Sequence, residues 1–336
     1  LGGLAVLNLE GVYTRYEDAD EQLERISRLP KEQATREMQA IYQAPLRPEL
    51  IAQRIREIKD QGVVVAASLT PQRVRDHYEL ALEAGLDILV IQGTVVSAEH
   101  KSEHTEPLNL KEFIREVGVP VVVGGCASYH TALHLMRTGA AAVLVGVGPG
   151  AACTTRGVLG IGVPQATAIA DAAAARSQQM LETGEYVKVI ADGGMRTGGD
   201  VSKAVACGAD AVMIGSPLAR AHEAPGRGFH WGMATFHASL PRGARVATVQ
   251  NGTLEEILTG PAHENDGTFN LFGALRTSMA TCGYKDIAEF NRAELMVAPA
   301  LQTEGKQLQA SQGVGMGARS GAQTSPANGG EKAPVA

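Results

Sequence analysis

Seven short apolar runs, separated by segments of helical character, constrain the fold of this chain more than any other feature. None of the runs alternates apolar with polar residues, so both faces of each predicted strand should be buried, as they are in a parallel sheet. Most of the intervening segments end on a glycine, which is typical of a helix C-terminus. The runs lie at residues 3–8, 63–69, 87–92, 119–125, 141–147, 187–194 and 210–216.

This alternation predicts the α/β class, and a length of 336 residues suits one (β/α)8 TIM barrel. A closed barrel of this type needs eight strands, whereas the sequence shows seven and opens almost directly on the first of them. We therefore expect one βα unit, of roughly 40–60 residues, to be missing upstream of Leu1. The alternative is an open, doubly wound sheet of seven strands.

The barrel is expected to span residues 1–305 as a single catalytic domain. Residues 11–47 are charged and helical in pattern, and they form an insertion after the first strand. Residues 306–336 are rich in Gly, Ala, Ser and Pro, a composition typical of a flexible tail.

Charge and cysteine usage narrow the functional class. The formal net charge is −6, and lysine and arginine are scattered along the chain, which argues against nucleic-acid and membrane partners. The sequence shows no run of about 18 apolar residues and no signal-peptide pattern. The four cysteines lie far apart without a CxxC pair, which predicts neither a disulfide framework nor a zinc site and favours a cytoplasmic location.

Two glycine turns mark a candidate phosphate site. Barrel enzymes bind phosphates in the loops after the last two strands, and here these loops read ADGGMRTGGD (191–200) and IGSPLA (214–219). Glycine lets backbone amides approach an anion closely, Ser216 adds a hydroxyl donor, and Asp192 is placed to accept hydrogen bonds from ribose hydroxyls. Each turn alone is also explained as a tight βα turn with Asp192 as a helix N-cap. Two such turns on adjacent strands favour a nucleotide monophosphate.

One cysteine, Cys153, lies at the centre of a segment with six glycines and two prolines, GVGPGAACTTRGVLGIGVPQ (146–165). A thiol on such a loop at the mouth of a barrel is placed to attack a bound substrate and then to release it. Its neighbours Thr154, Thr155 and Arg156 are polar, and a nearby cation would favour the thiolate. The sequence therefore indicates Cys153 as a nucleophile, with a purely structural cysteine as the alternative.

Five motifs together resemble the IMP dehydrogenase and GMP reductase family. GVGPGAACTTR is similar to the family's catalytic-cysteine loop, and ADGGM and MIGSPLARAHEAPG are similar to its phosphate and ribose segments. HWGMAT (230–235) is similar to the segment over the purine base, and GALRTSMATCGY (273–284) to the final helix. The resemblance covers residues 1 to about 285 and implies an active-site flap at 220–270. The family's regulatory CBS pair is absent, so the chain resembles the short, CBS-less branch related to IMP dehydrogenase.

The resemblance implies roles for individual residues. Cys153 would attack C2 of the purine, Thr155 would assist proton transfer or hold the attacking water, and Asp192 would bind the ribose hydroxyls. An arginine of the flap, Arg242 or alternatively Arg245, would act as the base for hydrolysis. The implied phosphate ligands are Gly193, Gly194, Gly215 and Ser216; the implied base contacts are Gly232, Met233 and Gln250; the implied cofactor contacts are Gln92, Gly93 and Thr94; and the implied potassium ligands are the carbonyls of Gly148, Gly150 and Cys153.

As a whole, the resemblance implies an NAD-dependent IMP dehydrogenase, which oxidises IMP to XMP through a covalent cysteine–purine intermediate in guanine nucleotide biosynthesis. It also implies a monovalent cation (K⁺) and a homotetramer or octamer. The family's tyrosine after the flap arginine is missing, which favours the alternative of an NADPH-dependent GMP reductase that converts GMP to IMP. A catalytically silent purine-nucleotide-binding regulator is a third alternative, although binding alone does not need the thiol.

Overall fold

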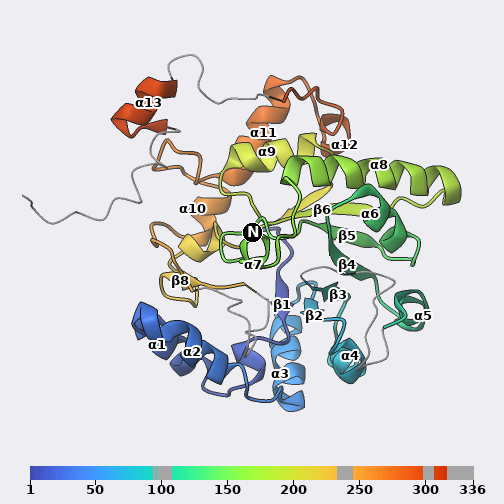
Figure 1. Ribbon diagram of the computed structural model, residues 1–336, viewed down its shortest axis with the longest axis vertical. Coiled ribbons are helices and arrows are strands. Elements are labelled where there is room, and N and C mark those ends of the chain that lie inside the picture. Colours follow the sequence, from blue (N-terminus) through green and yellow to red (C-terminus); the bar gives the residue numbers. More distant parts are fainter. Residues whose placement is uncertain (94–95, 97–107, 233–244, 298–305, 316–336) are drawn as a thin grey trace, which may run out of the picture.

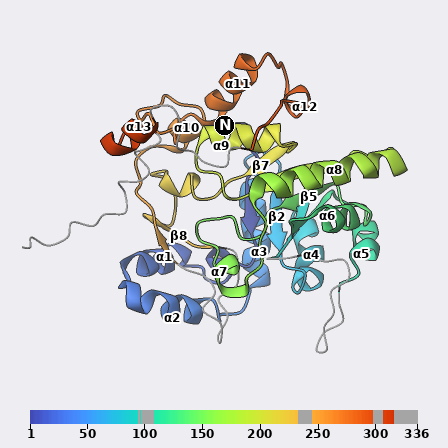
Figure 2. The ribbon, with the colours of Figure 1, turned by 45° about the horizontal axis from the view of Figure 1, so that its top comes forward.

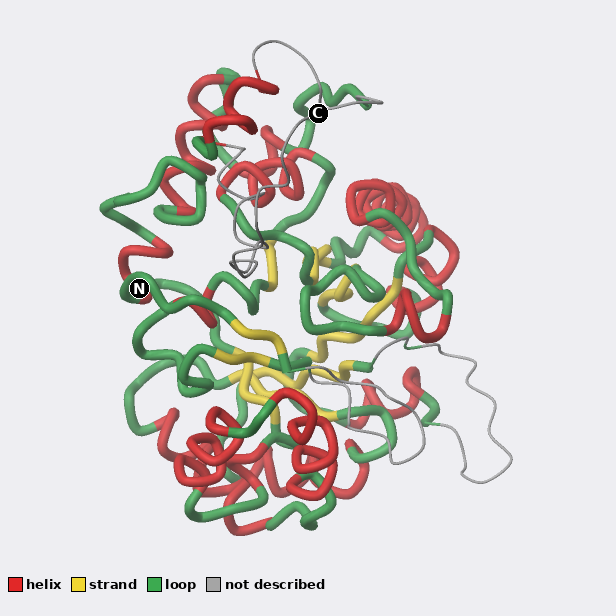
Figure 3. Tube along the Cα trace, turned by 60° about the vertical axis from the view of Figure 1, so that its left-hand side comes forward, coloured by secondary structure: helices red, strands yellow, loops and turns green. Residues whose placement is uncertain are grey.

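The computed structural model describes residues 1–93, 96, 108–232, 245–297 and 306–315. Seven parallel strands form one sheet whose spatial order follows the chain order, from β1 at one edge to β7 at the other. Figures 1 and 3 show these strands at the centre of the molecule, with helices on the outside. The strands are β1 (Val6–Asn8), β2 (Ala66–Leu69), β3 (Ile88–Gln92), β4 (Val121–Cys126), β5 (Ala142–Val145), β6 (Lys188–Asp192) and β7 (Ala211–Met213), so all seven predicted strands are confirmed.

The helices complete a barrel-like (β/α)8 arrangement, as predicted. The sequential strand order excludes the doubly wound alternative, because strand order reverses in such a sheet. The eighth strand expected upstream of Leu1 stays a prediction. None of the described helices combines the length and the hydropathy that crossing a membrane requires. The helices after the first six strands are α3 (Pro48–Lys59), α4 (Val74–Glu83), α5 (Leu110–Glu116), α6 (Tyr129–Met136), α8 (Gln165–Thr183) and α9 (Gly198–Ala206), and α11 (Leu271–Thr281) packs on α9 after β7.

Strand β3 contributes to two cores, because successive side chains point to opposite faces of a sheet. Leu89 and Ile91 of β3 belong to the large cluster between the sheet and the helices. Val90 of the same strand packs with Val122 and Leu144 in a separate cluster on the other face. Both faces of the sheet are therefore buried, which explains why the apolar runs do not alternate.

A repeated sequence element links neighbouring strands at their amino ends. EAGLDILVIQG and ACGADAVMIGS each place a glycine and then an aspartate between a helix and a strand. Asp87 accepts a hydrogen bond from the amide of Val65, just before β2, at 2.8 Å, and Asp210 accepts one from the amide of Val189, in β6, at 2.8 Å. Each carboxylate also binds a cationic side chain from the helix that precedes the neighbouring strand. The repeat therefore ties β3 to β2 and β7 to β6 at their amino ends.

After β7 the chain leaves the regular alternation of strand and helix. Two short strands, β8 and β9, form an antiparallel pair. These strands are β8 (Phe229–His230) and β9 (Val246–Ala247), and the same region contains the 3-10 helix η2 (Leu218–Arg220) and the helices α10 (Leu254–Leu258) and α12 (Ile287–Phe290). Another 3-10 helix, η1 (Val12–Thr14), follows β1.

The charged segment 11–47 forms a small helical unit beside the barrel. Helices α1 (Ala19–Arg28) and α2 (Lys31–Ile41) enclose a hydrophobic core of their own, and Figures 1 and 2 show them next to β8. Trp231 packs against this core and donates a hydrogen bond from Nε1 to the hydroxyl of Tyr42 at 2.7 Å. The helical unit thus supports the chain just after β8.

The flexible tail expected over 306–336 begins with a short helix, and its flexibility stays a prediction. This helix is α13 (Lys306–Gln312), and the amide of Gly315 donates to Oδ1 of Asn265 at 3.3 Å. The reason is local composition, because KQLQASQ contains no glycine or proline, and the glycine-rich part begins only at Gly313. Residues 316–336 lie outside the described residues.

Candidate active site

Three segments come together at the carboxyl ends of β5, β6 and β7, where barrel enzymes bind their ligands. They are the cysteine loop (residues 146–163), the turn at Gly193–Gly194 and the turn at Gly215–Ser216. A Cβ atom on Gly194 would lie only 2.9 Å from Cβ of Pro149, and the two glycines of that turn have φ values of +78° and +79°. The cysteine loop therefore rests directly on this turn, an approach that glycine permits.

A buried hydroxyl holds the thiol of Cys153. Its Sγ donates to Oγ1 of Thr155 at 3.1 Å, and its amide donates to the carbonyl of Gly150 at 3.1 Å. Thr155 begins the short helix α7 (Thr155–Leu159) and is 1% exposed, whereas Cys153 is partly exposed. The sulfur is thus open to a ligand, and the hydroxyl beside it is placed to exchange a proton with it.

Arg156 braces the cysteine loop instead of pairing with the thiol. Its Nε donates to the carbonyl of Val147 at 3.1 Å, and its Nη2 donates to the carbonyl of Val163 at 2.6 Å. Its aliphatic stem lies against Gly148 and Gly162, where a Cβ atom would collide with it. The guanidinium therefore joins the two ends of the loop, and its donors go to backbone carbonyls.

Asp192 and Gln92 form a hydrogen bond between two strands that are not neighbours in the sheet. Gln92 ends β3, and its Nε2 donates to Oδ2 of Asp192, the last residue of β6, at 2.9 Å. Burial raises the pKa of Asp192 to about 6, and the hydrogen bond from Gln92 opposes this shift only in part. Oε1 of Gln92 is buried and accepts no hydrogen bond from the described residues. The pair therefore offers acceptors for the hydroxyl or N–H groups of a ligand.

The raised pKa of Asp192 predicts that its charge costs stability at neutral pH. The folded pKa of about 6 exceeds the ordinary value of 3.8, so the folded state gains stability from the protonated group in acid and loses this gain as the pH rises through 6. We expect Asp192→Asn to raise the free energy of unfolding by about 2–3 kcal/mol near pH 7.5 and to change it little near pH 4. Urea unfolding of both proteins at the two pH values measures this difference. Equal stabilities near pH 7.5 would contradict the interpretation.

The two glycine turns supply free backbone donors for an anion. The amides of Gly194, Gly215 and Ser216 donate to no described residue, and both of these glycines are exposed. A Cβ atom on Gly215 would meet nothing within 4 Å, so open space lies next to it. The amide of Gly193, in contrast, already donates to the carbonyl of Met213 at 3.0 Å. Three unpaired N–H groups and the hydroxyl of Ser216 suit a phosphate group.

A chain of hydrogen bonds that the sequence analysis missed continues from Ser216. Its Oγ lies 3.0 Å from Nε2 of His230, in β8, and Nδ1 of the same ring lies 2.7 Å from Oγ1 of Thr248, just after β9. The motif HWGMAT begins with His230, but the resemblance directed attention to Gly232 and Met233. The histidine at the start of that motif was the one signal available in the sequence.

Two further residues that were predicted to contact a ligand each donate a hydrogen bond to a backbone carbonyl. The amide of Gly93 donates to the carbonyl of Gly124 at 2.9 Å, which continues the pairing of β3 with β4. Nε2 of Gln250 donates to the carbonyl of Ala221 at 2.8 Å, so its Oε1 is the end left to contact a ligand. Gly232 is described and partly exposed.

Arg245, the alternative candidate for the hydrolytic base, is used elsewhere. Its guanidinium donates to the carbonyls of Ile26 and Leu29 at the end of α1, and it lies 4.1 Å from the ring centroid of Phe229. A cation at this position satisfies the last carbonyls of a helix. Arg245 is therefore not free to act as a base. Three other predicted site residues lie outside the described residues: Thr94, Met233 and Arg242.

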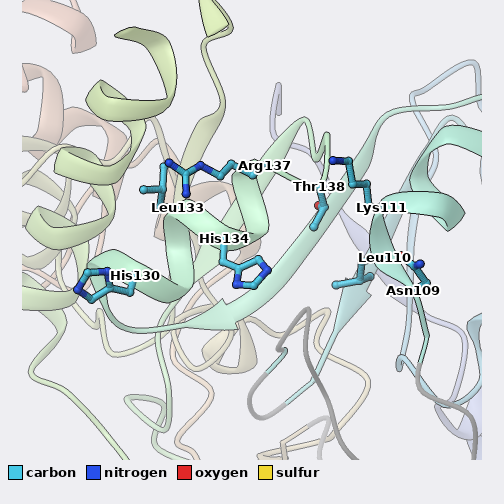
Figure 4. Close-up of a pocket in the computed structure, with 8 residues that line it drawn as sticks. All are labelled: Asn109, Leu110, Lys111, His130, Leu133, His134, Arg137 and Thr138. Carbon is cyan, nitrogen blue, oxygen red and sulfur yellow. The ribbon is translucent and has the colours of Figure 1, made fainter. Parts of the chain in front are cut away.

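A cavity of about 490 Å³ opens between α5 and α6, on the outer layer of helices. Figure 4 shows the basic side chains that line it, among them Lys111, His134 and Arg137. Arg137 already forms a two-pronged ion pair with Glu182 of α8, with a shortest contact of 2.7 Å. The cavity contains none of the predicted site residues, so the barrel mouth is the candidate active site.

The chain is similar to known proteins over most of its length. The model of one family, the IMP dehydrogenase / GMP reductase domain, matches residues 2–307. An uncharacterized oxidoreductase of Mycolicibacterium smegmatis is 48% identical over 306 residues, which cover 88% of this chain and 82% of that protein. A crystal structure of an IMP dehydrogenase/GMP reductase-like protein from Corynebacterium glutamicum shares 45% identity with a TM-score of 0.83, over 88% of this chain and 79% of that one.

A more distant relative has a named reaction. The inosine-5′-monophosphate dehydrogenase of Methanocaldococcus jannaschii is 31% identical over 283 residues. The match covers 73% of this chain but 53% of that protein, so this chain spans about half the length of that relative.

Proposed function

The chain belongs to the IMP dehydrogenase / GMP reductase family of oxidoreductases, and on this premise we propose that it oxidises IMP to XMP with NAD. One observation carries the proposal: the partly exposed thiol of Cys153 lies on a loop that packs against one of the glycine turns. A nucleotide bound by its 5′-phosphate at those turns would lie beside this loop. Its ribose would meet Asp192, whose carboxylate accepts hydrogen bonds.

In the proposed reaction, the sulfur of Cys153 adds to C2 of IMP, and the hydride on C2 leaves. Water then adds to C2, the carbon–sulfur bond breaks, and XMP is released with the free thiol. Thr155 already receives the thiol hydrogen bond, so its hydroxyl is placed to assist proton transfer during attack, by relaying the proton, and to hold water during hydrolysis. Arg242 would serve as the base that activates this water.

The residues present fit a dinucleotide and a monovalent cation. The buried Oε1 of Gln92 has no donor among the described residues, so it would accept a hydroxyl or amide hydrogen from the cofactor. NAD, when bound, supplies the hydride acceptor. The carbonyls of Gly148 and Cys153 accept no hydrogen bond from the described residues, and that of Gly150 accepts one from the amide of Cys153. All three carbonyls keep lone pairs that suit K⁺.

GMP reductase is the second candidate function. In that reaction Cys153 adds to C2 of GMP, ammonia leaves, and a hydride from NADPH yields IMP. The sequence observation that favours it is the missing tyrosine after Arg242 and Arg245. Because Arg245 donates to carbonyls at the end of α1, Arg242 is the remaining candidate for the hydrolytic base. The presence of Arg242 and the motif set as a whole favour the dehydrogenase.

The two reactions are separated by one pair of assays. The protein is incubated with IMP and NAD, and in parallel with GMP and NADPH, and the absorbance of the reduced cofactor is followed. The proposal expects reduced cofactor to form in the first assay and not to be consumed in the second, and the reverse result would identify a GMP reductase. Absence of turnover in both, without labelling of Cys153 by a 6-chloropurine nucleotide, would indicate a silent binding protein. Light scattering on the same sample tests the proposed homotetramer or octamer.

A further inference from the structure

We propose that His230 is a positioning residue that turns the hydroxyl of Ser216 toward the 5′-phosphate of the substrate, with Thr248 holding the ring in the required tautomer. The inference rests on the proposed function, because it takes a purine nucleoside 5′-monophosphate as the ligand. It adds two residues, His230 and Thr248, to which the family resemblance assigned no individual role.

The ring of His230 is held at both of its nitrogens. Nε2 lies 3.0 Å from Oγ of Ser216, and Nδ1 lies 2.7 Å from Oγ1 of Thr248. The three residues come from the end of β7, from β8 and from the residue after β9. With both nitrogens engaged, the ring cannot rotate without losing a hydrogen bond, so its orientation toward Ser216 is set by the fold.

The protons on this chain decide what Ser216 offers to an anion. If Nδ1 carries the ring proton and donates to Thr248, Nε2 is an acceptor and consumes the hydroxyl hydrogen of Ser216. Ser216 would then present only lone pairs to a phosphate, which repels them. If Nε2 carries the proton and donates to Ser216, the hydroxyl of Thr248 donates to Nδ1 and the hydrogen of Ser216 is free. A bound phosphate therefore selects the second arrangement.

The surroundings of the ring make the tautomer, rather than the charge, the relevant variable. Partial burial lowers the pKa of His230, which favours the neutral ring. The arginines that flank the hairpin turn toward the helical unit: Arg227 pairs with Glu24 at 3.3 Å, and Arg245 donates to carbonyls of α1. The amides of Gly194, Gly215 and Ser216, which donate to no described residue, are neutral donors. With only neutral donors of this kind, one correctly directed hydroxyl contributes a large share of the binding of a phosphate.

The test measures binding of IMP and of inosine, which differ by the phosphate, to the wild type and to variants. His230→Leu removes the ring contacts, and His230→Gln restores a donor near Ser216. We expect His230→Leu to weaken IMP binding by about 10- to 100-fold, the effect of one hydrogen bond to a charged group, and to change inosine binding less than about 2-fold. His230→Gln should recover most of the loss. In turnover, KM for IMP should rise while kcat changes little.

A second measurement uses the wild-type protein, and a variant at His230 is needed only to assign the NMR signal of that residue. Nitrogen NMR of histidine-labelled wild-type protein distinguishes the two tautomers, and addition of IMP should shift His230 to the form protonated on Nε2. Thr248→Val, which removes the partner of Nδ1, should weaken IMP binding in the same direction as His230→Leu. Inorganic phosphate serves as a competitor whose affinity should fall in both variants.

The outcomes separate this inference from the proposed function. Equal losses of IMP and inosine affinity, unchanged IMP affinity in His230→Leu, or an Nδ1-protonated ring in the complex each overturn the role of His230. Binding of IMP without turnover by NAD overturns the proposed reaction alone and leaves this test intact. If the protein binds GMP instead, the comparison is made with GMP and guanosine. Failure of the wild type to bind either monophosphate overturns both.

Discussion

Replacing Cys153 by alanine is expected to lower turnover of IMP by roughly 10⁴- to 10⁶-fold, the range seen when a covalent nucleophile is removed. The physical reason is that, in the proposed reaction, the hydride leaves C2 only after sulfur has added to it. The Thr155 hydroxyl, which holds the thiol at 3.1 Å, is less nucleophilic and buried. Affinity for IMP should change little, since the phosphate and ribose contacts come from other segments.

The matched control is Cys282→Ala, because Cys282 is the exposed cysteine outside the candidate site. It should retain turnover within about 2-fold, as is usual for a surface substitution that removes no contact. Steady-state rates and labelling by a 6-chloropurine nucleotide are measured on both variants, with labelling lost in Cys153→Ala alone. A Cys153→Ala protein as fast as its parent would overturn the covalent mechanism.

Asp210→Ala is expected to lower the free energy of unfolding by about 3–5 kcal/mol, because it leaves a buried cation without its partner. The side chains of Asp210 and Arg176 are 15% and 10% exposed, and the contact between them is 2.7 Å. The same carboxylate accepts hydrogen bonds from the amide of Val189 and from the hydroxyl of Tyr186, both at 2.8 Å. The substitution removes the acceptor of all three donors at once. Water does not easily replace that acceptor at the buried amide of Val189 and guanidinium of Arg176.

The sequence repeat provides the control for this prediction. Asp87 occupies the same place in the repeat and accepts the amide of Val65, but its side chain is 35% exposed and its partner Lys59 is 43% exposed. We therefore expect Asp87→Ala to cost about 1 kcal/mol, since water replaces the lost partners. Guanidinium chloride unfolding of the two variants measures both values. Equal losses of unfolding free energy in the two variants would show that burial does not govern how much these aspartates stabilise the fold.

Local sequence patterns were sufficient to locate the strands, the cysteine loop and the glycine turns. Apolar runs without alternation require burial on both faces, and that requirement is visible without knowing the neighbours of a strand. The turn at Gly193–Gly194 was also recognisable, because positive φ and close approach to Pro149 both demand glycine. The short helix at 306–312 was not predicted, because composition was averaged across a boundary at Gly313.

The tertiary structure alone decided which side chains meet. Gln92 and Asp192 are 100 residues apart, and Arg245 reaches carbonyls of α1 that lie 216 and 219 residues away. The contact of His230 with Ser216 and Thr248 depends on how β8 and β9 pack beside the end of β7. A hydrogen bond needs its two atoms within about 3 Å, and this precision arises only when whole elements pack together. The sequence therefore determined the backbone and the kinds of reactive group, whereas packing determined their partners.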